Sequence, residues 1–429
     1  MGGQRKSPLK VLPSASRLVS SMRDLGYDCP QAVADLVDNS IAAGATRVEI
    51  ALGFQGAEAF LCVVDNGEGM SAAKITEAMR YGTRQSYGEE ALGKFGLGLK
   101  TASLSQCRRL TIASRTSRSA VRIEVRELDL DHILARDRWE IFDVPASAAD
   151  ERLVVPLRRG VGTVVLWEML DRVLGYKLPS GKHARNGLAD LAEQLEQHLG
   201  MIFHRFLAGE VPGQKRVTMT VNDRTVKPWD PFARCETATM SLPAFDIDVR
   251  TNDSVGIVHV QPFVLPPKEK FSSEEAFHWY GGPRKWNAQQ GFYIYRANRM
   301  IQCGGWCRMR TVDEHLKLAR AAIDFYPELD TAFEINVAKV RAMIPVDLRE
   351  RLRGPIEKLT RAAQAAYRTN AQLERGPSTR LRRDGPMDAT VVRGALERAA
   401  SAANEKAALR RIAGKLRTHD PHIAKELGW

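Results

Sequence analysis

The sequence predicts an α+β fold, because helical patterns come first and several strand patterns follow at irregular spacing. Residues 15–44 repeat apolar side chains every three or four positions, with one break at Cys29 and Pro30. From residue 45 onward, short segments either alternate polar and apolar residues or are apolar throughout, as strands are. Long interruptions separate these segments, which favours helices layered on a sheet over a doubly wound parallel fold.

The first block, residues 17–174, contains the helices and most of the predicted strands. Leu18, Met22 and Leu25 mark a first helix, and the proline just inside the next segment suits the start of a second. The fully apolar run at 59–65 predicts a strand buried on both faces. The predicted strands are ATRVEIAL (45–52), AFLCVVD (59–65), RRLTIASR (108–115), AVRIEVREL (120–128) and GTVVLWEML (162–170).

The second block, residues 175–345, is also a mixture of helix and strand. A helix is predicted over 187–206, followed by strands RVTMTVND (216–223) and SVGIVHVQPF (254–263) and the strand-turn-strand GFYIYRANRMI (291–301). Leu348, Leu352, Ile356 and Leu359 fall on one face of a long helix over 346–374, with a bend expected at Pro355. We expect a terminal strap at 1–16, a linker at 375–386 and a basic helical tail at 387–429, helical over about 390–416.

Composition limits the possible classes of protein. The formal charge is +12, and residues 375–429 hold 12 Lys and Arg against 6 Asp and Glu, which favours an acidic partner such as nucleic acid. No segment approaches the ~20 apolar residues of a membrane helix, and the N-terminus lacks an apolar signal core. The six cysteines show no framework spacing, so we expect a cytoplasmic protein with no membrane contact.

The segment ADLVDNSIAAGA, residues 34–45, places three polar side chains close together on the second predicted helix. Asp35 and Asn39 lie four positions apart and therefore project from the same face, with Asp38 beside them. Asp and Asn weaken a helix interior because they compete for its backbone groups. The cluster is either a solvated helix face or a site that needs carboxylate and amide groups.

The segment DNGEGM, residues 65–70, follows the buried strand directly. Asp65 ends that strand, and Gly67 and Gly69 allow the backbone to turn sharply without a Cβ atom in the way. A carboxylate in this position can accept a hydrogen bond from an amine donor such as the exocyclic amine of adenine. A plain hairpin turn is the alternative interpretation.

The segment LGKFGLGLKTASLS, residues 92–105, is rich in glycine and then turns helical. Exposed N–H groups at the start of a helix can bind phosphate. The segment is not a P-loop, because Leu99 separates Gly98 from Lys100 and breaks the G-x-x-x-x-G-K-[ST] register. Its G-x-x-G-x-G pattern also lacks the strand and acidic residue of a dinucleotide-binding fold.

Taken in order, D-x-x-x-N, D-x-G-x-G, G-x-x-G-x-G and the Gly162-Thr163 pair resemble the GHKL ATPases, which include gyrase B subunits, the ninety-kilodalton heat-shock chaperone, histidine kinases and MutL. The resemblance covers about residues 13–170. It implies a Bergerat-type α/β sandwich that binds ATP and Mg²⁺, and an enzyme that hydrolyses ATP to ADP and phosphate.

The resemblance assigns a role to each matching position. Asn39 would hold the magnesium that bridges the triphosphate, and Asp35 would polarise the attacking water. Asp65 would accept the adenine amine, with Thr163 supporting it through water. Segment 81–90 would be a mobile lid hinged at Gly82 and Gly88. The other implied nucleotide contacts are Gly67, Gly69, Met70, Thr83, Gly93, Lys94, Phe95, Gly96, Leu97, Gly98, Leu99 and Lys100.

Two positions depart from the family pattern. The family's usual base is Glu, whereas Asp35 is one methylene shorter, and a base must lie within ~2.6–3.2 Å of the proton it takes. Asp38 is a rival base, but its register does not match. Ala42 stands where many relatives have Asp. We therefore expect slow turnover.

Short sequence motifs also predict the branch of the family. The short stretch before the site has no phosphoaccepting His, which argues against a histidine kinase. The chain resembles the prokaryotic MORC-like branch in two features: Lys100 directly follows G-x-G-L, and the motif DLVDNS is present. The second block is similar to the transducer domain of MORC, MutL and gyrase, in which a catalytic lysine reaches the γ-phosphate. Lys339 is the candidate, and a solvated surface lysine is the alternative.

Two classes of function remain open from the sequence. The first is an ATP-gated clamp that closes as a homodimer, with the strap crossing to its partner, and holds double-stranded DNA for maintenance or antiviral defence. The second is an ATP-gated protein-interaction switch or chaperone-like module without direct DNA binding. No nuclease signature is present, so any cutting would come from a partner nuclease or effector protein.

Overall fold

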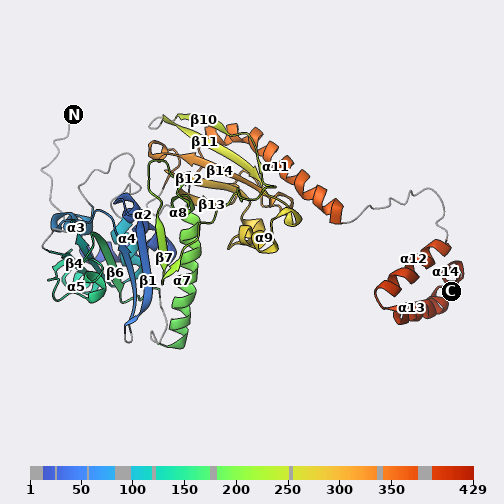
Figure 1. Ribbon diagram of the computed structural model, residues 1–429, viewed down its shortest axis with the longest axis horizontal. Helices are drawn as coiled ribbons and strands as arrows, with labels where there is room; N and C mark the ends of the chain where they lie inside the picture. The colour runs from blue at the N-terminus through green and yellow to red at the C-terminus, as the bar shows by residue number, and fades with distance from the viewer. Residues whose placement is uncertain are drawn as a thin grey trace, which may run out of the picture. The chain divides into compact units, whose positions relative to one another are not determined.

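The computed structural model describes residues 13–24, 27–55, 58–82, 98–117, 122–173, 181–250, 255–335, 342–374 and 389–429. The chain divides into two compact units, Met1–Ala371 and Gln372–Trp429. The first unit contains two sheets with their helices, and the described residues of the second form helices (Figure 1). The predicted α+β class is confirmed.

An eight-stranded sheet carries the first block, in the order β5-β4-β3-β6-β2-β1-β7-β8. The strands predicted in the first block correspond to β1, β2, β3, β4 and β6, and nearly all neighbours in the sheet are antiparallel. The strands are β1 (Arg47–Gln55), β2 (Glu58–Asp65), β3 (Arg109–Arg115), β4 (Glu124–Asp129), β5 (Phe142–Asp143), β6 (Gly162–Glu168), β7 (Thr218–Val221) and β8 (Arg224–Thr225).

Helices cover one face of this sheet and share a core with it. The side chain of Ser14 caps the first helix by accepting a hydrogen bond from the Arg17 N–H, and Asp28 caps the second in the same way. Figure 1 shows α2 beside α4, and α7 running along β1 and β7. These helices are α1 (Ala15–Arg23), α2 (Cys29–Ala42), α3 (Ala72–Met79), α4 (Gly98–Gln106) and α7 (Lys182–Ile202).

The opposite face of the sheet is also buried over β2, β3 and β6. Cys62, Val164 and Leu166 project from it and pack against Leu153 and Val154 of α6 (Glu151–Val154). Their neighbours along the strands, such as Val63 and Val165, point into the helical core instead. The apolar run of β2 is explained by this two-sided burial. Helix α5 (Leu130–Arg136) packs against α1.

The large sheet extends beyond the first block. Strand β7 pairs with β1 in parallel, so that Arg47 lies opposite Thr218 and Ile50 opposite Val221. Helix α7 packs against both strands. The sheet therefore uses residues from both sides of the boundary expected at 174/175, because β1 would otherwise be an uncovered edge.

A six-stranded sheet carries the second block, in the order β10-β11-β14-β12-β13 with β9 beside β11. The predicted strand-turn-strand at 291–301 is confirmed as the β12–β13 hairpin, with Ala297 and Asn298 at positive φ in its turn. The strands are β9 (Met240–Ser241), β10 (Phe245–Arg250), β11 (Val255–Val264), β12 (Gly291–Arg296), β13 (Arg299–Cys303) and β14 (Ala319–Phe325).

The remaining helices of the first unit are mostly short. The helix predicted over 187–206 is divided into α7 and α8 at Phe203. The long helix α11 (Val346–Glu374) passes through Pro355 without ending and buries Leu348, Leu352 and Leu359. The others are α8 (His204–Ala208), α9 (Glu274–Gly281) and α10 (Lys285–Ala288), with 3-10 turns η1 (Lys268–Lys270), η2 (Glu314–Leu316) and η3 (Pro327–Leu329).

The expected helical C-terminal segment is confirmed. It is divided into α12 (Ala389–Ala402), α13 (Lys406–His419) and α14 (Pro421–Glu426), and it extends beyond residue 416. Asn404 adopts φ 58°, and the N–H of Glu405 donates to the carbonyl of Ala400 at 2.8 Å, which ends α12 in a Schellman-type turn. Among the described helices, none has the length and apolarity that a membrane span requires.

Candidate functional site

Asp65 is held at the end of β2 by three hydrogen bonds. Its Oδ1 accepts from the backbone N–H groups of Gly67 at 2.8 Å and Thr163 at 3.3 Å, and its Oδ2 accepts from Ser40 Oγ at 2.9 Å. Burial raises the pKa of Asp65, while the bonds from Gly67, Ser40 and Thr163 act in the opposite direction. A carboxylate offers about four acceptor positions, so one remains for an amine donor.

The sheet register brings a second polar group to the same end. Thr163 on β6 lies opposite Asp65 on β2, and also opposite Ser114 on β3. Ser114 Oγ lies 3.0 Å from Thr163 Oγ1, donates to the Gly162 carbonyl at 2.8 Å and accepts from the Met70 N–H at 2.7 Å. Sequence reasoning missed Ser114, although it stands near the end of a predicted strand.

Two glycines at this end of the sheet are needed for close backbone packing. Gly69 has φ +71°, and a Cβ atom on it would lie 2.2 Å from the Arg115 carbonyl oxygen. Gly162 has φ +146°, and its Cβ atom would lie 1.9 Å from the Asp65 carbonyl oxygen. A side chain at either position would push apart the strands that hold Asp65.

Two of the three residues in the polar cluster of α2 are buried, so the cluster is not simply a solvated helix face. Asp35 is 3% exposed and Asp38 is 1% exposed, whereas Asn39 is exposed. Ser40, the next residue, holds Asp65, so α2 and the end of β2 form one site. Buried carboxylates need charge or hydrogen-bond partners, and both aspartates have them.

Tyr27 and Arg299 hold the two aspartates from different sides. The Tyr27 hydroxyl donates to Asp35 Oδ2 at 3.1 Å, and the pKa of Tyr27 is raised by burial and by the charge and hydrogen bond of Asp35. Arg299 Nε donates to Asp38 at 3.1 Å, and its Nη2 lies 3.7 Å from Asp35 Oδ1. Sequence reasoning missed both, although it predicted the strand-turn-strand that carries Arg299.

The first turn of α4 lies beside the same carboxylate. A Cβ atom on Gly98 would lie 3.7 Å from Asp35 Oδ2, so the helix start faces Asp35. Leu99 is partly buried against the core. Lys100 is fully buried and donates to the Arg80 carbonyl, and burial lowers its pKa to about 8. N–H groups at this helix start are suited to an anion.

Several expected contacts lie outside the described residues. They are Thr83, Gly88, Gly93, Lys94, Phe95, Gly96, Leu97, Lys339 and most of the strap at 1–16. The described residues bring together Asp35, Asn39, Asp65, Gly67, Gly69, Met70, Gly98, Lys100 and Thr163.

The residues of the site suit a magnesium ion that is bound mostly by water and phosphate oxygens. In the described part of the chain, no group of three or more His, Cys, Asp or Glu side chains could enclose a metal ion. The exposed Asn39 is one amide ligand, and Mg²⁺ characteristically keeps waters and phosphate oxygens for its other positions. The site therefore fits a metal that arrives with a phosphate ligand.

Comparison with known sequences agrees with this geometry. Residues 27–161 match the family described as histidine kinase-, DNA gyrase B-, and HSP90-like ATPase. These residues include α2, the Asp65 turn and α4, and they end just before Gly162 and Thr163.

Relatives named DNA mismatch repair protein MutL match parts of the chain. The protein from Rhizobium leguminosarum bv. trifolii is 40% identical over 130 residues, which is 30% of this chain and 20% of the relative. The one from Shewanella baltica is 27% identical over 205 residues, or 46% of this chain and 27% of the relative. The one from Rhodospirillum rubrum is 36% identical over 90 residues, or 20% and 14%. The matches thus span about a quarter or less of these relatives.

The motifs, the sandwich around them and the family match agree over the same residues. The chain therefore carries, at residues 27–161, an ATPase-type domain of the GHKL superfamily.

Proposed function

We propose that this protein binds ATP with magnesium and hydrolyses it slowly. The observation that carries the proposal is the fixed carboxylate of Asp65 beside the polar face of α2. Asp65 accepts the adenine amine, and Thr163 and Ser114 support this end of the pocket. The start of α4 at Gly98 and the buried Lys100 face the phosphates.

Asn39 holds the magnesium ion, which supplies charge neutralisation for the triphosphate. Asp35 takes the proton of the attacking water. Its short side chain and its contacts with Tyr27 and Arg299 restrict its approach to that proton, which supports slow turnover. Lys339 remains the proposed contact from the second block to the γ-phosphate.

We further propose that ATP closes the protein as a homodimeric clamp on double-stranded DNA. The similarity to MutL proteins, which are named for DNA mismatch repair, supports a DNA-related role. The basic residues at 375–429 would contact phosphates, with strong salt dependence. The strap at 1–16 would cross to the partner copy. A MORC-like branch, a role in antiviral defence and a partner nuclease belong to the same proposal.

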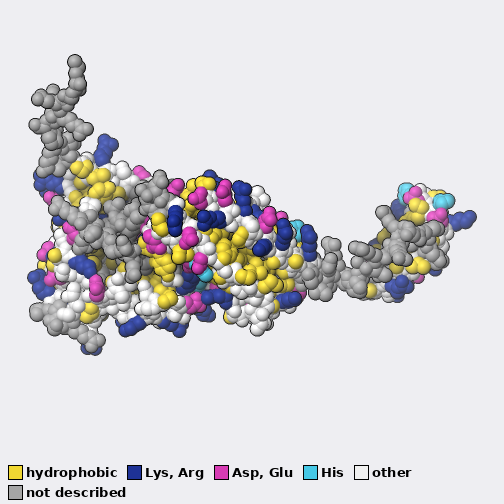
Figure 2. Space-filling view, turned by 90° about the horizontal axis from the view of Figure 1, so that it is seen from above, with side chains coloured by type: hydrophobic (Ala, Val, Ile, Leu, Met, Phe, Trp, Pro, Cys, Tyr) yellow, Lys and Arg dark blue, Asp and Glu magenta, His cyan; other side chains and the backbone are white. Residues whose placement is uncertain are grey.

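A second candidate is an ATP-gated switch that acts on a partner protein without direct DNA binding. Figure 2 shows Lys and Arg mixed with Asp and Glu over the visible face of the first unit, with apolar side chains between them. A mixed surface of this kind favours protein contacts over a continuous DNA track.

Nucleotide binding and turnover test the proposal directly. We expect wild type to bind a fluorescent ATP analogue and release phosphate. Asp65→Asn should weaken binding roughly tenfold or more, because it removes a charged acceptor in a buried site. Asp248→Asn, on the exposed face of β10, is the matched control and should bind like wild type. Wild type that binds no nucleotide would contradict the proposal.

Retention on DNA separates the two candidates. A clamp should remain on closed circular double-stranded DNA in moderate salt only when ATP is present, and Asn39→Ala should abolish this retention. Absence of ATP-dependent retention, with nucleotide binding intact, would favour the protein-directed switch.

A further inference from the structure

Arg299 connects the second block to the polar face of α2. It begins β13, in the six-stranded sheet, yet its partner Asp38 lies 261 positions earlier in the chain. The side chains of Arg299, Asp35 and Asp38 are 2%, 3% and 1% exposed. The guanidinium also lies 5.9 Å from the ring of Phe203 at the end of α7. The contact is therefore a buried junction between the six-stranded sheet and helix α2.

The guanidinium divides its contacts unequally. Its Nε donates to Asp38 within hydrogen-bond distance, at 3.1 Å, whereas its Nη2 is 3.7 Å from Asp35 Oδ1. Asp38 therefore fixes the plane of the guanidinium. Asp35 lies in its field at a longer distance. Because the hydrogen bond of Arg299 goes to Asp38, the guanidinium acts on Asp35 through its charge and does not hold it in a hydrogen bond.

Tyr27 completes the positioning of Asp35 from the other side. Its hydroxyl donates to Oδ2, while Arg299 faces Oδ1. Gly98 at the start of α4 also approaches Oδ2. The short side chain of Asp35 has two torsions, and it is restrained by a hydrogen bond at Oδ2 and by a positive charge near Oδ1.

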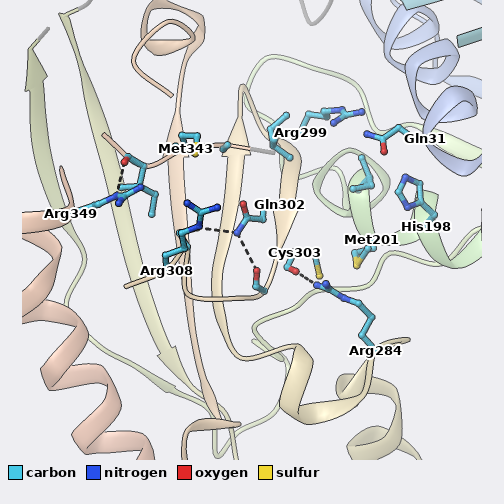
Figure 3. A pocket seen from close by; sticks show the side chains of 16 residues that line it. Gln31, His198, Met201, Arg284, Arg299, Gln302, Cys303, Arg308, Met343 and Arg349 are labelled. Carbon is cyan, nitrogen blue, oxygen red and sulfur yellow. Dashed lines mark hydrogen bonds between the residues drawn. The ribbon is translucent and has the colours of Figure 1, made fainter. Parts of the chain in front are cut away.

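A cavity lies beside Arg299, and Gln31 of α2 also lines it. It has a volume of about 480 Å³, and Arg284, Arg308 and Arg349 also line it. Among the described residues that line it, there is no Asp or Glu. Figure 3 shows the Arg299 side chain directed toward Gln31 of α2, away from the other arginines. Like charges in the cavity and carboxylates on α2 therefore both favour the observed orientation.

We infer that Arg299 is a positioning residue through which the second block holds Asp35 for water activation. The inference rests on the proposed ATPase function and deepens it. It makes the rate of hydrolysis depend on the position of the β12–β13 hairpin, whereas adenine recognition at Asp65 depends on the first sheet and on Ser40 of α2. The cavity beside Arg299 leaves space for the hairpin to shift.

The test compares Arg299→Gln and Arg299→Lys with a matched control on the same hairpin. Arg296→Lys changes another buried guanidinium, which pairs with Asp330 inside the second block at 2.6 Å. We expect Arg299→Gln to lower kcat by about ten- to a hundredfold, because a base misplaced by ~1 Å loses about that much. Its affinity for a fluorescent ATP analogue should stay within about threefold. Arg299→Lys should recover part of kcat, and Arg296→Lys should keep the wild-type kcat.

The outcomes separate this inference from the proposed function. If Arg299→Gln does not fold, Asp38→Asn replaces it and should also lower kcat, because the released guanidinium then pairs closely with Asp35. Unchanged or raised kcat in a variant that binds nucleotide would overturn the inference. Equal losses of kcat and affinity, or wild type that binds ATP without hydrolysing it, would also overturn it. Wild type that binds no nucleotide would contradict the proposed function itself.

Discussion

Single residues near α4 combine burial with charge, and Lys100 is the clearest example. Its side chain is fully buried, its ammonium group donates to the Arg80 carbonyl, and burial lowers its pKa from 10.5 to about 8. A buried cation with one neutral partner costs stability. A functional role on the phosphates would explain why such a residue stands at the start of α4.

Replacing Lys100 should therefore raise the stability of the protein and lower its affinity for ATP. Between about pH 8 and 10.5 the unfolded chain binds more protons at this position than the folded protein does, so the penalty is complete below pH 8 and fades as pH rises. We expect Lys100→Met to be more stable than wild type by about 1–2 kcal/mol near neutral pH, with the gap closing toward pH 10.5. Its affinity for ATP should fall.

Urea unfolding at several pH values and nucleotide titration measure the two effects. Lys74→Met is the matched control, since Lys74 is exposed on α3 and should show no such pH-dependent gap. A gap that widens as pH rises would contradict the assignment.

At the scale of elements, the pairing of β7 with β1 joins the two blocks. The sequence predicts both strands but not their partnership, because parallel pairing between distant segments depends on the path of the chain between them. Helix α7 lies in that path and packs against both strands. The first sheet should therefore lose stability when a residue of the second block is truncated.

Met219→Ala tests this coupling. Met219 is completely buried in β7, and truncating a buried Met should cost about 2–5 kcal/mol. The loss of stability should appear in the same unfolding transition in which nucleotide binding is lost. Met240→Ala, on β9 and 50% exposed, is the control and should change stability little. A separate transition for Met219→Ala would contradict coupling between the blocks.

At the scale of the whole molecule, the chain has one unit with two sheets and a second unit in which residues 389–429 form α12, α13 and α14. The proposed nucleotide contacts belong to the first unit. Half of the excess positive charge belongs to residues 375–429, which are almost the whole of the second unit. Nucleotide binding should therefore need only the first unit, whereas DNA retention should need both units.

Removing residues 372–429 should leave nucleotide affinity and turnover close to wild type. DNA retention should weaken, and its dependence on salt should become shallower, because fewer phosphate contacts release fewer counterions. Filter binding over a salt series and phosphate release measure the two activities. A large loss of nucleotide affinity would show that the second unit contributes to the ATP site.

The sequence determined the features that depend on local pattern. The 3.6-residue and 2-residue periods predicted α1, α2 and most strands of the first sheet. The helical character of the tail was confirmed, but its division at Asn404 was not predicted, because the left-handed residue that ends α12 is Asn, which marks such ends less strongly than Gly. Motif order predicted the superfamily from positions that the structure brings together, such as Asp65 and Thr163. Domain limits and residue roles stay predictions.

The tertiary structure alone decided which distant residues complete the site. Tyr27, Ser114 and Arg299 carry no local signal for their roles, since each acts through a partner on another element. Tertiary contacts also decided that Asp35 and Asp38 are buried, because α4 and the β12–β13 hairpin cover that face of α2. Burial and ion pairing depend on what packs against a helix, and helical periodicity does not contain that information.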